Sequence, residues 1–92
     1  MAELSEILRS DKTVVVDVRS PQEFMGGHVA ESMNIPLNEI SEHLEELKTM
    51  GQIVLCCASG GRSHQATIFL HQQGINCING GAWTNVNYYK NN

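Results

Sequence analysis

Two short apolar runs constrain the fold of this chain more than any other feature. Thr13 to Val16 and Ile53 to Cys56 are apolar at nearly every position and rich in β-branched side chains. A strand with one exposed face alternates apolar and polar residues, whereas a strand covered on both faces reads as a continuous apolar run. Both runs therefore predict strands in the interior of a sheet, with other layers packed against it.

Helical patterns separate the predicted strands along the chain. Ser20, Pro21 and Glu23 combine a capping serine, a first-turn proline and a glutamate three residues after the cap, which together signal a helix start. We expect helices over 3–10, from 20 to 26, over about 38–50 and over 64–73, and further strands over 32–35 and 75–78. This alternation predicts an α/β fold with a central parallel sheet and helices on both faces.

The length and charge of the chain exclude several classes of protein. Ninety-two residues allow a single domain, spanning 1–92. The formal net charge is −4 and no basic stripe exists, so we expect no nucleic-acid partner. No apolar stretch approaches the ~20 residues that a membrane span requires, so we expect no membrane partner either.

The N-terminus and the cysteines indicate the compartment. Residues 1–6 lack the basic and apolar regions of a secretory signal. The chain has three cysteines, and an odd number without secretory features suits reduced thiols better than a disulfide framework. The four histidines show no ligand spacing with these cysteines, so we expect no metal and no other cofactor. These patterns predict a cytoplasmic protein.

One segment carries the residues that suggest chemistry, Cys56-Cys57-Ala58-Ser59-Gly60-Gly61-Arg62-Ser63. It joins a predicted strand to a predicted helix, and ligand sites in open α/β sheets lie outside the carboxyl ends of the strands. The free N–H groups and the dipole at a helix N-terminus favour a thiolate, which is the nucleophilic form of cysteine. A loop of small residues can turn its amides inward as an anion-binding nest, and Arg62 adds a permanent positive charge.

Four motifs resemble those of the rhodanese family, the persulfide-forming sulfurtransferases. The loop from Cys57 to Arg62 matches the family pattern Cys-x-x-Gly-x-Arg. Residues 17–24 resemble the first family motif, 27–36 the second and 80–83 the closing motif, so the resemblance spans about residues 13 to 84 in the right order. It implies a rhodanese-like three-layer fold with four to five strands. The fifth is a short edge strand before the first helix, for which residues 1–3 are barely long enough.

The resemblance also implies an activity and its residues. Cys57 is the expected catalytic residue, and the expected substrate-binding residues are Ala58, Ser59, Gly60, Gly61, Arg62 and Ser63. The thiolate would take a sulfane sulfur from a small-molecule donor such as thiosulfate and hold it as a persulfide. Cyanide, a small thiol or a thiol of another protein would then accept that sulfur. The loop amides and Arg62 would stabilise the negative charge on the terminal sulfur.

A second register is open in the same loop. Counted from Cys56, the run reads Cys-x5-Arg-Ser, the pattern of cysteine-dependent phosphatases and arsenate reductases. A longer loop admits a tetrahedral phosphate, whereas the shorter one suits a single sulfur atom. Neighbouring strand side chains point to opposite faces, so Cys56 points into packing if Cys57 opens into the loop. We favour Cys57; a redox role for the Cys56–Cys57 pair and a non-catalytic binding module are the further alternatives.

The remaining notable residues have structural interpretations. Asp17 and Arg19 end the first predicted strand and are candidates for the pocket rim, although structural ion pairing is the favoured interpretation. Arg19 is four residues from Glu23, a spacing that permits a local pair on a helix. We expect a core position for Cys77 and Trp83, a hydrogen-bonded His28, a helix-surface His64, and a peripheral tail containing Tyr88 and Tyr89.

Overall fold

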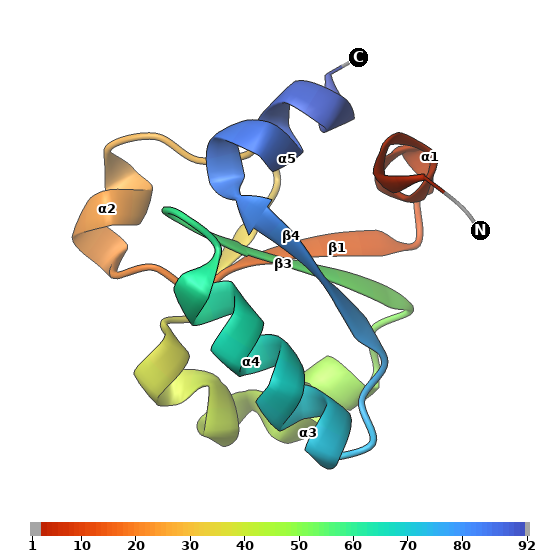
Figure 1. The fold of residues 1–92 in the computed structure, drawn as a ribbon. Coiled ribbons are helices and arrows are strands. Elements are labelled where there is room, and N and C mark those ends of the chain that lie inside the picture. Colours follow the sequence, from red (N-terminus) through yellow and green to blue (C-terminus); the bar gives the residue numbers. More distant parts are fainter. Residues whose placement is uncertain (1–2, 92) are drawn as a thin grey trace.

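The structure, a computed structural model, describes residues 3–91, which form a layered α/β domain (Figure 1). The elements follow in the order α1 (Leu4–Arg9), β1 (Thr13–Asp17), α2 (Pro21–Met25), β2 (Met33–Asn34), the 3-10 helix η1 (Leu37–His43), α3 (Leu44–Lys48), β3 (Gln52–Cys57), α4 (Gly61–Gln72), β4 (Cys77–Ala82) and α5 (Trp83–Lys90). Among these residues, no helix combines the length and the apolar character that a membrane crossing requires.

The strands form one parallel sheet in the order β2-β1-β3-β4. β3 lies between β1 and β4, with Gln52 opposite Thr13 and Cys56 opposite Asp17. This arrangement confirms the predicted α/β fold, and within residues 3–91 the sheet has four strands. The expected edge strand falls mainly on Met1 and Ala2, which lie outside the described residues.

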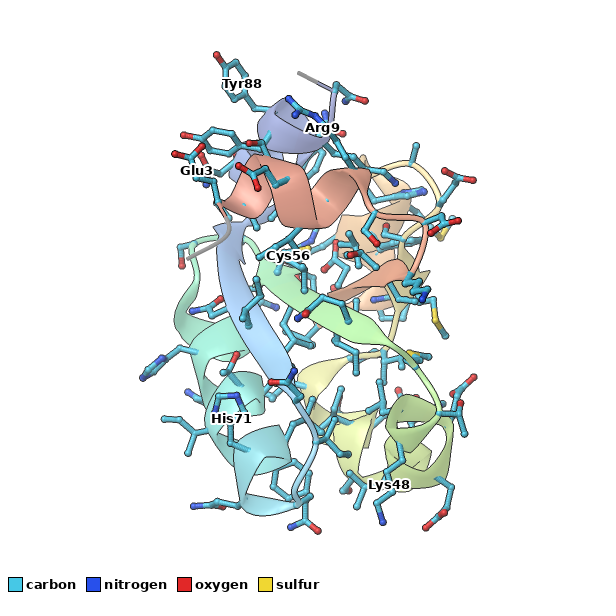
Figure 2. The ribbon with its side chains drawn as sticks, turned by 90° about the vertical axis from the view of Figure 1, so that its right-hand side faces the viewer. Glu3, Arg9, Lys48, Cys56, His71 and Tyr88 are labelled. Carbon is cyan, nitrogen blue, oxygen red and sulfur yellow. The ribbon has the colours of Figure 1, made fainter. Side chains whose placement is uncertain are left out.

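The two faces of the sheet carry separate apolar cores. One core lies under α1 and α5 and contains Leu8, Val15, Val29, Val54, Cys56 and Val86. The other lies under η1, α3 and α4 and contains, from β3, Ile53, Leu55 and Cys57. Side chains along β3 therefore alternate between the cores, as the pleat of a strand requires. Figure 2 shows Cys56 on the side of the sheet that α1 covers.

Several boundaries differ from those predicted. The helix expected over 38–50 is divided into η1 and α3, and His43 between them has a non-helical backbone (φ −115°, ψ 17°). β4 was expected over 75–78 but runs from Cys77 to Ala82, across a glycine pair that resembles a strand end. A register shift accommodates this pair: Asn79 is opposite Leu55 whereas Gly81 is opposite Cys56, so Gly80 is the extra residue of a β-bulge.

The helix α5 was not predicted, because the tail is rich in Asn, Thr and Tyr, which have weak helix propensity. Tertiary packing stabilises it instead. Val86 is fully buried in the core beneath α1 and α5, and such burial contributes roughly 1.5–3 kcal/mol. Tyr88 and Tyr89 are exposed, as expected of peripheral residues.

Candidate active site

The residues from β3 to α4 form a strand–loop–helix turn. β3 ends at Cys57, and α4 begins at Gly61, three residues earlier than the sequence predicted. Gly60 precedes the helix with a left-handed backbone (φ 103°), a conformation that glycine adopts at little cost. Because the helix begins early, Arg62 and Ser63 lie in its first turn, where the backbone N–H groups have no partner within the helix.

The sulfur of Cys57 lies against this turn. The Gly60 N–H donates to Sγ at 3.0 Å, and the Ser63 Oγ lies 3.5 Å from the same sulfur. Burial alone would raise the pKa of the thiol, since the side chain is only 1% exposed. Hydrogen bonds from the Ser63 hydroxyl and from the backbone N–H groups of Ser63, Gly60 and Ser59 outweigh burial, and the pKa of Cys57 lies below its ordinary value.

Cys56 lies in different surroundings. Its side chain is fully buried in the opposite core, among aliphatic residues. Desolvation, with a smaller contribution from the negative charge of Asp17, raises the pKa of Cys56 to about 12. Cys77, in β4, is buried as expected, and burial raises its pKa too. The structure thus brings one cysteine, Cys57, to hydrogen-bond donors of the loop.

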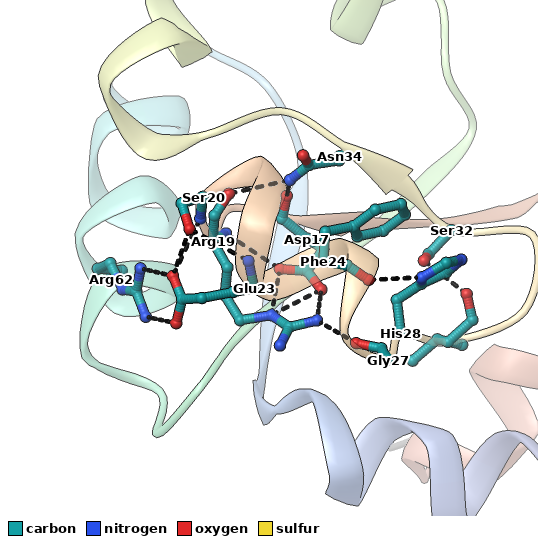
Figure 3. Close-up of polar contacts among 11 residues, drawn as sticks. Asp17, Arg19, Ser20, Glu23, Phe24, Gly27, His28, Ser32, Asn34 and Arg62 are labelled. Atoms are coloured by element: carbon teal, nitrogen blue, oxygen red, sulfur yellow. Dashed lines mark hydrogen bonds and ion pairs between the residues drawn. The ribbon is translucent and has the colours of Figure 1, made fainter.

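Arg62 forms an ion pair that sequence reasoning missed. Its Nη1 and Nη2 donate to Oε1 and Oε2 of Glu23 at 2.7 and 2.9 Å (Figure 3). Glu23 also belongs to the capping box of α2, because Oε1 accepts from the backbone N–H of Ser20. Hydrogen bonds from Arg62, followed by that from Ser20, lower the pKa of Glu23 to about 2. The bidentate pair connects α2 to the first turn of α4 beside the loop.

The local pair between Arg19 and Glu23 that the spacing allowed does not form. Arg19 instead folds back on Asp17, with Nε 2.9 Å from Oδ1 and Nη2 2.7 Å from Oδ2 (Figure 3). Nη2 also donates to the Gly27 carbonyl at 2.7 Å, and the Trp83 ring lies 4.9 Å from the guanidinium carbon.

Asp17 and Arg19 thus form a buried ion pair, the structural pairing that we favoured over a place at the pocket rim. They are 0% and 4% exposed, and neither is among the residues that line the cavity next to Arg62. The buried pair connects the end of β1 to Gly27 through the Nη2 hydrogen bond and to Trp83 through the ring contact. Asn34 adds to this tie by donating to the Asp17 and Arg19 carbonyls at 3.0 and 2.9 Å.

The histidines with assigned interpretations take structural positions. The Nδ1 of His28 lies 2.8 Å from the Phe24 carbonyl oxygen, and the His28 ring stacks on that of Phe24 with centroids 3.8 Å apart. His64 is exposed on α4. Across residues 3–91, no group of three or more histidine, cysteine or acidic side chains is arranged to hold a metal ion.

A cavity of about 530 Å³ lies beside the Arg62–Glu23 pair. Its walls are formed by the loops after β1 and β2 and by the first residues of α2, η1 and α4: Val18, Ser20, Pro21, Pro36, Leu37, Asn38, Glu39 and Arg62. Cys57 is not among these residues, so the cavity adjoins the sulfur site at the Arg62 end rather than enclosing it. Ala58 and Ser59 are exposed at the tip of the loop.

Asn79 is a second residue that sequence reasoning missed. Its Oδ1 lies 2.7 Å from the Ser63 hydroxyl, and its Nδ2 lies 3.5 Å from the Gly60 carbonyl oxygen. An asparagine before a glycine pair resembles a turn signal, and nothing in the sequence relates it to a loop 16 residues earlier. The register of β4 against β3 places it there.

Comparison with known proteins extends this picture. The Rhodanese-like domain family matches residues 1–90. The chain is 30% identical over 76 residues to the thiosulfate sulfurtransferase GlpE of Pseudomonas syringae, covering 83% of this chain and 72% of GlpE. It is 36% identical over 63 residues to YqhL of Bacillus subtilis, covering 68% of this chain, and it spans only half the length of that relative.

The solved structures agree with the family match. The rhodanese-like domain protein of Staphylococcus aureus superposes with a TM-score of 0.77 at 26% identity, covering 89% of this chain and 80% of that one. The arrangement of the sheet and its flanking helices is thus shared with this solved structure. The chain belongs to the rhodanese-like domain family.

Proposed function

We propose that the protein is a sulfurtransferase that carries a sulfane sulfur on Cys57. In the first step the Cys57 thiolate attacks the outer sulfur of thiosulfate; the Sγ–S bond forms, the bond to the sulfonate sulfur breaks, and sulfite leaves with the electron pair. In the second step a nucleophile, such as cyanide or a thiolate, attacks the terminal sulfur. The bond to Sγ breaks and its electron pair restores the thiolate.

One observation carries the proposal: a buried sulfur at the end of β3 accepts a hydrogen bond from the Gly60 N–H and lies beside the Ser63 hydroxyl. These donors favour the anion, which is the form that attacks. The segment from Ala58 to Ser63 is our proposed substrate-binding segment, since the backbone N–H groups of Ser59, Gly60 and Ser63 already stabilise negative charge on the Cys57 sulfur.

Arg62 has a narrower role than its charge alone suggested. Both of its terminal nitrogens are engaged by Glu23, so the pair is neutral as a unit. We assign to Arg62 the anchoring of the first turn of α4 to α2 through this pair.

The relatives support this proposal. One curated relative is named a thiosulfate sulfurtransferase and another a putative sulfurtransferase; the latter, YtwF of Bacillus subtilis, is 32% identical over 98% of this chain. The position of Cys56 weighs against the longer phosphatase-type loop, because its thiol is buried in the opposite core and has a raised pKa. It also weighs against a redox pair, because adjacent side chains on opposite faces of a strand do not meet.

Mass spectrometry of the protein before and after treatment with thiosulfate tests the proposal. We expect a mass gain of one sulfur atom on the peptide containing Cys57, and its loss after addition of cyanide. Cys57→Ala should show no gain, and Cys56→Ala should behave like the unaltered protein. If thiosulfate adds no sulfur to Cys57, the domain is better interpreted as a binding module that retains the motif.

A further inference from the structure

The Ser63 hydroxyl has more acceptors around it than it has hydrogens. Its Oγ lies 2.7 Å from the Asn79 Oδ1, 3.1 Å from the Gly60 carbonyl oxygen and 3.5 Å from the Cys57 Sγ. A hydroxyl donates one hydrogen, so only one of the three is fully satisfied at a time. The shortest distance is that to Asn79, which therefore competes with the sulfur for the hydrogen.

The backbone fixes which end of the Asn79 amide faces Ser63. The Gly81 N–H donates to Oδ1 at 2.9 Å, and only the oxygen of the amide can accept this hydrogen. The bulge in β4 brings the backbone N–H of Gly81 within reach of the Asn79 side chain. Gly80, the extra residue of the bulge, has no room for a side chain, because a Cβ built on it would lie 2.7 Å from a Val86 methyl carbon. Ser63 therefore faces an acceptor held in place by the sheet.

We propose that Asn79 is a positioning residue that holds the Ser63 hydroxyl hydrogen while the Cys57 sulfur is neutral and yields it when that sulfur is anionic. In the thiol form Ser63 donates to Asn79 and its oxygen accepts the S–H hydrogen. In the thiolate form the hydroxyl hydrogen turns to Sγ. Oδ1 keeps the hydrogen bond from Gly81, so neither state leaves the amide oxygen without a donor.

Under the proposed function this exchange would occur twice in each turnover. Sγ is anionic when it attacks the donor and becomes neutral when it forms the bond to the transferred sulfur, so Ser63 returns to Asn79. It becomes anionic again when the acceptor removes that sulfur. The inference extends the proposed function, but the equilibrium between thiol and thiolate tests it without any sulfur transfer.

Other charged groups face the same sulfur and must be held constant. From α4, Arg62 interacts electrostatically with Cys57, and Glu23 of α2 neutralises that arginine. From β1 and the loop after it, the charges of Asp17 and Arg19 interact electrostatically with Cys56, the residue before Cys57. Cys77 is the titratable group of β4 in the same core. A substitution of Asn79 alters none of these charges.

The test measures the pH dependence of Cys57 alkylation by iodoacetamide in the full chain. Asn79→Leu removes the acceptor and keeps the branched shape of the side chain, which is exposed to solvent in the unaltered protein; Asn79→Ala is a second variant if Leu disturbs folding. The proposal predicts a midpoint at lower pH and alkylation about two- to threefold faster at pH 7, because a lost hydrogen bond to the neutral form favours the thiolate. Asn85→Ala, an exposed asparagine of α5, is the matched control and should change nothing.

A double-mutant cycle identifies the route of the effect. Ser63→Ala alone should move the midpoint to higher pH, and adding Asn79→Leu to it should have no further effect. A midpoint that rises in Asn79→Leu would overturn the proposal and make Asn79 a support of the loop. A midpoint that Asn79→Leu leaves unchanged would overturn the proposal too. So would a midpoint that Asn79→Leu lowers by the same amount in the Ser63→Ala background as in the unaltered protein. Failure of Cys57 to take sulfur from thiosulfate would reject the proposed function while leaving this comparison intact.

Discussion

Cys56 and Cys57 are neighbours in one strand, yet they belong to two different regions of the molecule. Both are essentially inaccessible, at 0% and 1% exposed. Cys56 lies in the core beneath α1 and α5, where its neighbours are aliphatic and its pKa rises to about 12. Cys57 lies on the α4 side, where its pKa falls below the ordinary value of a thiol.

Burial alone therefore does not decide whether a cysteine in this protein is reactive. Desolvation opposes ionisation of both thiols, and it is the largest single influence on each. What separates them is the supply of hydrogen-bond donors: the α4 face offers a helix N-terminus and a serine, whereas the α1–α5 face offers Asp17, whose charge disfavours a second anion. The pleat of β3 assigns each cysteine to its face.

The largest effect should come from removing each cysteine in turn. Cys57→Ser should lower sulfur transfer from thiosulfate to cyanide by at least about a thousandfold, because the nucleophile is lost. Cys56→Ala should retain activity within a small factor and destabilise the fold by about 1 kcal/mol through a small cavity. The measurements are thiocyanate formation and denaturant unfolding. If Cys56→Ala abolished sulfur transfer and Cys57→Ser retained it, Cys56 would be the nucleophile, and the longer loop counted from Cys56 would be favoured.

Alkylation of the native protein should sharpen the comparison without any mutation. At pH 8 only about one Cys56 in 10⁴ is ionised if its pKa is about 12. Cys57 should therefore react with iodoacetamide at least about a hundredfold faster, as its thiolate is the more abundant. Cys77, whose pKa burial raises, should behave like Cys56 and react on unfolding. Peptide mapping after timed alkylation gives the three rates; equal rates for Cys56 and Cys57 would contradict the assignment of the two faces.

Two glycines, one on each side of the comparison, should differ in their tolerance of a methyl group. A Cβ on Gly80 meets Val86 and Val54 side chains at 2.7 and 2.8 Å, within the core that holds Cys56. A Cβ on Gly61, in the first turn of α4, meets nothing within 4 Å. Gly80→Ala should lower the free energy of unfolding by about 1–3 kcal/mol, as overpacked cores do. Gly61→Ala should be neutral or slightly stabilising in urea unfolding, and an equal loss in both would refute the packing argument.

The parts of this architecture that follow from local patterns could be predicted from the sequence. Thr13 to Val16 and Ile53 to Cys56 read as strands because a buried strand is continuously apolar, and the parity of β3 separates the two cysteines. α5 escaped prediction because Val86, its buried residue, is stabilised by α1 and the sheet rather than by helix propensity.

The site was predictable only as far as its contiguous loop. Glu23 is 39 residues from Arg62 in the sequence. Its role in the capping box with Ser20 already accounts for a glutamate at this position, so nothing in the sequence indicates a second partner. Asn79 reaches Ser63 only because the bulge shifts β4 against β3. Partners brought together by topology leave no signal in spacing, so the loop could be identified but not the residues that support it.

The smallest expected effect concerns the Arg62–Glu23 ion pair, which lies at the surface beside the Cys57 loop. Both side chains of the Arg62–Glu23 pair are more than one-third exposed, so solvent screens it. The pKa of Glu23 is lowered from 4.5 to about 2 in the folded protein, so its ionised form stabilises the fold above about pH 4.5. That contribution is lost progressively as the pH falls from about 4.5 through about 2, and below about pH 2 the carboxylate becomes protonated in both states.

Glu23→Gln should therefore be less stable than the unaltered protein at pH 7, and the gap should close as the pH falls from about 5 to about 2. Urea unfolding across this range measures the gap. Glu45→Gln is the matched control, because Glu45 is 94% exposed on α3 and lies 3.6 Å from its partner Lys48. A gap that stays constant with pH would show that Glu23 acts through its capping hydrogen bonds rather than its charge. The Arg62–Glu23 pair would then only hold the loop in position. The difference in pKa between Cys56 and Cys57 would depend on the backbone amides and Ser63 alone.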